Sequence, residues 1–157
     1  MLYGWIMIGF LLAFLVPFIF YLLTLQKALA AIAPESRTMA PAQVWLLFVP
    51  LFNIVWQFIV VSRMSDSIKN ECTRLNIPVA EERPTYALGL VMTLFYLGSL
   101  VLNRSNISPL FGGICIIASF VCWIVYWLKI VGYKNLIIVN RDNFLLDAER
   151  EAMQGRS

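Results

Sequence analysis

Four uncharged polar side chains are the first candidates for chemistry, because they lie within strongly apolar stretches of the sequence. Asn53 and Gln57 are four residues apart and would share one face of a helix. Thr93 and Ser119 lie in two other apolar stretches. Such residues line a pore when they face water, and they join helices by hydrogen bonds when they face a neighbouring helix. Both interpretations stay open, and we favour the interhelical one.

A second candidate group consists of charged residues that follow two of the apolar stretches. Arg63, Asp66 and Lys69 follow the second stretch, and Lys129 and Lys134 follow the fourth. Basic residues at the end of a membrane span attract the phosphates of anionic lipids. The five residues are therefore a candidate site for a lipid headgroup or a partner protein, although an ordinary membrane anchor is the simpler interpretation.

The residue types that most enzymes use are missing. The absence of His excludes Ser-His-Asp and Cys-His catalysis, His-ligated haem and a HExxH zinc site. Cys72, Cys115 and Cys122 form no CxxC pair, so we expect no disulfide framework and no metal site. No basic patch interleaves with aromatic residues, which argues against a nucleic-acid partner. We expect a protein that is not an enzyme and uses no cofactor.

The placement of charge indicates a membrane protein. The 157-residue chain is 61% apolar and only 13% charged, against about 25% charged in ordinary soluble domains. Four windows contain no Asp, Glu, Lys or Arg: residues 1–26, 38–62, 84–103 and 105–128. Each is near or above the roughly 20 residues that a helix needs to cross a bilayer. The sequence therefore predicts an all-α bundle of four transmembrane helices, arranged as two antiparallel hairpins, with spans at 2–24, 44–61, 85–102 and 110–128.

Two further features follow from the charge pattern. Opposite charges three residues apart continue from Arg63 to Arg74, so we expect a long second helix that extends into the cytoplasm to about Asn76. Residues 1–140 are expected to form the membrane domain, with a tight turn at 103–108, and residues 141–157 a short cytoplasmic tail.

The distribution of Lys and Arg predicts the orientation of such a four-span protein. With both termini in the cytoplasm, nine of these residues lie inside and three outside, and the reverse orientation exchanges the numbers. The positive-inside rule therefore favours two cytoplasmic termini. Trp5, Trp45, Tyr86 and Trp127 fall near the expected interfaces, where aromatic residues gather.

Several short stretches together carry a resemblance to known proteins. They are residues 24–27 (TLQK), 34–37 (PESR), 44–53 (VWLLFVPLFN), 56–58 (WQF), 66–68 (DSI), 126–130 (YWLKI) and 132–133 (GY). In these stretches the chain resembles small bacterial inner-membrane proteins with four spans and no known function. The resemblance implies a multi-pass protein of the bacterial inner membrane and assigns no site residue.

The expected function is a non-enzymatic interaction or assembly protein that self-associates. Four helices of this length enclose a packed core but hardly a wide pore. Gly9, Ala13 and Pro17 follow one another at four-residue spacing and form a small-residue stripe that lets another helix approach closely. The expected partners are the lipid bilayer and either a second copy or another membrane protein. The alternative is a small oligomeric channel or transporter for a small solute or ion.

Overall fold

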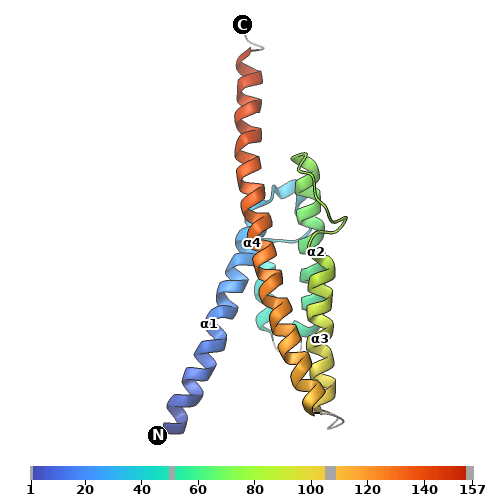
Figure 1. Cartoon of the computed structure of the whole chain (residues 1–157). Coiled ribbons are helices and arrows are strands. Elements are labelled where there is room, and N and C mark those ends of the chain that lie inside the picture. The colour runs from blue at the N-terminus through green and yellow to red at the C-terminus, as the bar shows by residue number, and fades with distance from the viewer. Residues whose placement is uncertain (1, 50–51, 105–108, 155–157) are drawn as a thin grey trace.

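The computed structural model describes residues 2–49, 52–104 and 109–154. Within these ranges the chain is helical and contains no strand (Figure 1). Pro50 and residues 105–108 of the expected turn lie outside the described residues. The elements are α1 (Leu2–Ala31), the 3-10 helices η1 (Pro34–Ser36) and η2 (Pro41–Phe48), α2 (Phe52–Arg74), α3 (Tyr86–Arg104) and α4 (Pro109–Gln154).

Three helices of the described chain are long and apolar enough to cross a membrane. They cover Trp5–Ala31 in α1, Tyr86–Arg104 in α3 and Leu110–Gln154 in α4. The all-α prediction is therefore confirmed, the three apolar helices support a membrane protein, and they overlap the first, third and fourth predicted spans.

The segment 44–61 differs from the predicted single crossing helix. Residues 44–48 belong to η2, and α2 begins only at Phe52. Pro41 suits the first turn of η2, where its missing N–H costs no hydrogen bond. Residues three apart share a face of a 3-10 helix, and Val44 and Leu47 are accordingly both buried. The uncharged part of α2 ends at Ser62. This part is roughly 15 Å long, which is about half the thickness of the hydrocarbon layer.

The residues on either side of this segment lie together at one end of the molecule. The backbone N–H of Thr38 donates to Ser67 Oγ at 2.9 Å, and Thr38 Oγ1 donates to the Arg63 carbonyl oxygen at 2.8 Å. A crossing by residues 44–61 would place Thr38 and Ser67 at opposite ends. The structure instead has two helical segments here, η2 and α2, and holds Thr38 and Ser67 at the same end of the molecule.

The end of α2 agrees closely with the predicted extension. Asn76 adopts a left-handed conformation with φ of 53°, which short polar side chains tolerate. The N–H of Asn76 donates to the Thr73 carbonyl, and the N–H of Ile77 donates to the Cys72 carbonyl at 2.8 Å. This is the Schellman arrangement that closes the last turn of a helix and satisfies its carbonyl groups.

α4 is longer than the predicted fourth span. It contains 46 residues without a break. Residues 141–154, expected as a separate short tail, continue the same helix. The first 20 residues of α4 are uncharged, and the charged residues begin at Lys129.

α1 and α4 contact each other in the same chain direction. The Tyr21 ring lies 5.4 Å from Trp123 and 6.2 Å from Trp127, between ring centres. Ten residues further along α1, the Ala31 carbonyl accepts a 3.4 Å hydrogen bond from Arg141, further along α4. The start of α1 and the end of α4 accordingly lie at opposite ends of the molecule (Figure 1).

α3 contacts α4 in the reverse order along the chain. Ser119 Oγ donates to the Met92 carbonyl at 3.2 Å. Gly89, earlier in α3, lies against Tyr126, later in α4. The ring of Tyr126 and the side chain of Val61 leave no space for a side chain at position 89, so a glycine allows α2, α3 and α4 to meet there.

Charge is concentrated at one end of the molecule, which we call the polar end and define as residues 27–43, 62–85 and 129–154. All nine acidic residues and ten of the twelve basic ones belong to these ranges. Arg104 lies at the other end, where α3 finishes. The indole N–H groups of Trp45 and Trp127 donate to Gln26 and Thr24, next to the polar end. Aromatic residues at this depth are typical of the boundary between lipid and water.

Candidate functional site

The four predicted polar residues within the apolar stretches make different contacts. Thr93 is buried, and its hydroxyl donates to the Gly89 carbonyl of its own helix at 2.8 Å. Ser119 bonds a carbonyl of α3, which is the interhelical role expected for it. Asn53 and Gln57 lie in the first two turns of α2, half-buried. The Gln57 side chain lies beside the hydroxyl of Tyr21 on α1.

Two of the predicted charged residues stabilise the linker between α2 and α3. Arg83 of the linker donates to Asp66 Oδ1 at 2.7 Å, and Lys129 Nζ donates to Glu81 Oε1 at 2.5 Å. The hydrogen bonds from Lys129 and from the Thr85 N–H hold the pKa of Glu81 below its ordinary value. Asp66 and Lys129 therefore tie the linker to α2 and α4, and their charges are compensated within the protein.

The other three predicted charged residues, Arg63, Lys69 and Lys134, do not lie together. Lys69 is exposed on the outer face of α2, and Lys134 is half-buried on α4. Neither has a carboxylate within ion-pair range among the described residues. Arg63 lines a pocket.

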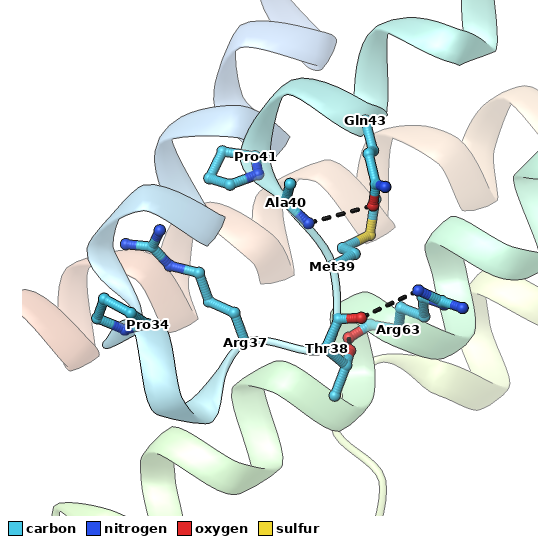
Figure 2. Close-up of a pocket in the computed structure, with 8 residues that line it drawn as sticks. All are labelled: Pro34, Arg37, Thr38, Met39, Ala40, Pro41, Gln43 and Arg63. Carbon is cyan, nitrogen blue, oxygen red and sulfur yellow. Dashed lines mark hydrogen bonds between the residues drawn. The ribbon is translucent and has the colours of Figure 1, made fainter.

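This pocket lies at the polar end, beside the hairpin of η2 and α2 (Figure 2). Its volume is about 400 Å³. It lies between the chain that follows α1 and the exposed Arg63 of α2. The lining residues are Pro34, Arg37, Thr38, Met39, Ala40, Pro41, Gln43 and Arg63.

Two arginines give the pocket its charge. Arg37 donates from Nε to the Ile32 carbonyl at 2.8 Å and from Nη2 to the Ala30 carbonyl at 3.0 Å, and these bonds cap the end of α1. Arg63 donates from Nη1 to the Thr38 carbonyl at 3.1 Å. Backbone carbonyls orient both guanidinium groups without neutralising them. Figure 2 shows Arg37 directed toward the end of α1 and Arg63 toward Thr38.

Gln43 fixes the opposite wall of the pocket. Its side-chain oxygen accepts a 3.1 Å hydrogen bond from the Ala40 N–H (Figure 2), and its carbonyl accepts one from Trp56 of α2 at 2.9 Å. The start of η2 is therefore tied both to its own first turn and to α2. The pocket walls are held by hydrogen bonds rather than by apolar packing alone.

Arg37 is the residue that sequence reasoning did not include in the site. Its Pro-Glu-Ser-Arg context correctly indicates a loop, but a crossing by residues 44–61 places this loop far from Arg63. The hydrogen bonds of Thr38 to α2 bring the two arginines to one pocket. The chemistry available there is anion binding by guanidinium N–H groups.

Among the described residues, no group of three or more His, Cys, Asp or Glu side chains could hold a metal ion. No protein-family description, curated protein or solved structure matches this chain.

Proposed function

We propose that the protein crosses the membrane three times, through α1, α3 and the first part of α4, and that η2 and α2 form a re-entrant hairpin between the first two crossings. The three long apolar helices support the crossings. The contacts of Thr38 with Ser67 and Arg63 support a hairpin that returns to its own side. Irregular backbone is tolerated at membrane depth where protein covers it, and the buried Val44 and Leu47 fit that condition.

The orientation follows from the basic residues. In this arrangement ten described Lys and Arg residues lie at the polar end and Arg104 lies at the other. The positive-inside rule then assigns the polar end to the cytoplasm, with the N-terminus outside and the C-terminus inside. The asymmetry is much larger than the nine to three of the four-span interpretation. With the resemblance to bacterial proteins, we assign the protein to the inner membrane.

Within that membrane, the proposed role is that of a non-enzymatic assembly protein that self-associates through the first half of α1. One observation carries this proposal: α1 contacts α4 near Tyr21 and beyond, and diverges from it toward its own start (Figure 1). Leu11, Ala13 and Phe14 are exposed, and nothing lies within 4 Å of a side chain placed at Gly9.

Helix association in lipid depends on close van der Waals packing, because lipid tails are as apolar as the helix surface. The exposed Gly9 and Ala13 lie on one face of α1 and would let a second backbone approach closely. A second copy of α1 offers the same face, so the contact would be symmetric, as in most dimers of identical chains.

Disulfide crosslinking in native membranes tests this role. In a chain whose three cysteines are replaced by Ser or Ala, Ala13→Cys is expected to give a covalent dimer on mild oxidation. Leu11→Cys is the matched control, because Leu11 is also exposed but faces away from the stripe. A monomer with both variants would contradict self-association through α1, and equal dimer with both would show random collision instead.

A channel or transporter is the second candidate, and one observation favours it. Asn53 and Gln57 lie on the half of α2 that belongs to the proposed re-entrant hairpin, and such hairpins line conduction pathways in known channels. Flux into liposomes tests it. A channel requires flux that Asn53→Leu with Gln57→Leu abolishes, whereas amides that only join helices would leave no flux in either protein.

A further inference from the structure

The pocket of Arg37 and Arg63 lies at the depth of lipid headgroups in the proposed membrane orientation. The indole of Trp45, four residues beyond Pro41, donates to Gln26 beside the polar end. Trp side chains prefer the boundary between headgroups and hydrocarbon. η2 starts at the pocket and runs away from the polar end (Figures 1 and 2). In the proposed placement the pocket therefore lies on the water side of this boundary.

Arg37 and Arg63 differ from three of their basic neighbours in how their charge is compensated. Three neighbours form ion pairs with carboxylates: Arg74 with Glu71, Arg83 with Asp66 and Lys129 with Glu81. Arg37 and Arg63 bond backbone carbonyls instead, and no carboxylate lies within ion-pair range of either in the described chain. Two positive charges thus remain available to an external anion.

The guanidinium groups also keep unused donors. Arginine has five N–H donors, and the carbonyl bonds use two of those of Arg37 and one of those of Arg63. The carbonyl bonds also fix the direction of both side chains, and they point to opposite sides of the loop (Figure 2). A ligand of Arg63 would not have to order that side chain. A fork of N–H donors matches the oxygens of a phosphate group better than the single charge of lysine does.

We propose that this pocket binds the phosphate group of an anionic phospholipid from the cytoplasmic leaflet. Arg63 donates to the phosphate oxygens, and Arg37, whose guanidinium group lies on the opposite side of the loop (Figure 2), adds positive charge to the pocket. The acyl chains follow η2 into the membrane, where Leu46 and Phe48 are partly exposed. The volume of about 400 Å³ accommodates a glycerophosphate headgroup. This inference rests on the proposed membrane placement and gives the polar end a specific ligand class.

Titration of the purified full-length protein in neutral detergent tests the pocket. Phosphatidylglycerol and phosphatidylcholine are added separately, and binding is followed by native mass spectrometry. Phosphatidylglycerol is expected to bind more tightly, because phosphatidylcholine carries a compensating positive charge. Arg63→Gln is expected to weaken phosphatidylglycerol binding roughly tenfold, the effect of one charge-assisted hydrogen bond, and Arg63→Lys is expected to restore only part of it.

Lys134→Gln is the matched control, because Lys134 also lies at the polar end but outside the pocket. It is expected to leave binding unchanged. Two results would overturn the proposal that the pocket binds the lipid: unchanged binding in Arg63→Gln, or an equal loss of binding in Lys134→Gln. Either result would mean that the lipid is attracted only diffusely to basic residues. Arg63→Gln carries the test alone, because Arg37 also caps α1 and its removal affects folding.

Inorganic phosphate distinguishes the two sources of such a group. Displacement of the lipid by millimolar phosphate would mean that the phosphate group alone is recognised, and a soluble phosphate ester would then serve as well. Failure to displace it would mean that the acyl chains along η2 contribute, as a membrane lipid requires. The titration reports on the pocket only, whereas orientation is measured by labelling, so either idea can fail without the other.

Discussion

The backbone N–H of Thr38 donates to the hydroxyl of Ser67 at 2.9 Å, across 29 residues of sequence. The same hydroxyl donates to the Arg63 carbonyl of its own helix at 2.7 Å. Through this serine the loop after α1 is fixed to α2. The contact holds the start of the segment 38–67 and its end at the same end of the molecule.

Ser67→Ala is expected to destabilise the protein by about 1–3 kcal/mol, because it leaves the Thr38 N–H without its partner in a part-buried site. Unfolding in detergent, followed by circular dichroism, measures the change. Ser62→Ala is the control: Ser62 lies in the same helix, is only half-buried and is expected to cost a few tenths of a kcal/mol at most. Equal stability of the two variants would show that the contact contributes nothing.

Gly89→Ala is expected to cost about 1–3 kcal/mol by overpacking. An added Cβ would lie 2.5 Å from Val61 Cγ1 and 2.9 Å from Tyr126 Cε2, so α2 or α4 would have to move. Gly98→Ala in the same helix is the control, since nothing lies within 4 Å of that position. Adding Val61→Ala to Gly89→Ala should recover part of the loss, and failure to do so would place the clash elsewhere.

Glu71 is expected to make the stability of the folded protein depend on pH. Burial raises the pKa of this fully buried carboxyl, but hydrogen bonds from Arg74 and Ser36 and the charge of Arg74 outweigh it, so the pKa lies below its ordinary value of 4.5. A lowered pKa in the folded state adds stability above the unfolded pKa, and this stability is lost as the pH falls through the folded value.

Unfolding measured between pH 7 and pH 3 tests this dependence. Glu71→Gln is expected to lower stability at pH 7 by about 1–3 kcal/mol and to flatten the decline toward acid. Glu149→Gln, at an exposed position of α4, is the control and should follow the parent protein. If Glu71→Gln also followed the parent curve, another group would have to be responsible for the acid sensitivity.

The sequence alone predicts the helices that its charge-free windows contain. Windows 1–26, 84–103 and 105–128 correspond to α1, α3 and the first part of α4, because an uncharged run of this length has few stable forms other than a crossing helix. The i, i+3 charge pairs after Arg63 likewise predict the outer half of α2, which ends at Arg74.

The window 38–62 could not be interpreted in the same way. Its 25 uncharged residues are enough for one crossing helix or for a hairpin of two shorter segments. The average hydropathy of the window does not distinguish these two arrangements. The difference arises from tertiary contacts: Thr38 to Ser67, and Trp56 to the Gln43 carbonyl. Arg37 was missed for the same reason, because its proximity to Arg63 depends on the return of the hairpin.

The side of the membrane on which Glu35 lies distinguishes three crossings from four. Glu35 is exposed in η1, directly before the hairpin, and the two interpretations assign it to opposite sides of the membrane. Single cysteines at Glu35, Arg104 and Arg150 of a chain without its native cysteines can be treated with a membrane-impermeant thiol reagent in intact bacterial cells. With three crossings and a re-entrant hairpin, only Arg104→Cys is expected to be labelled in intact cells, and Glu35→Cys and Arg150→Cys are expected to be labelled after the inner membrane is opened. Labelling of Glu35→Cys together with Arg104→Cys in intact cells would contradict this arrangement and restore four crossings.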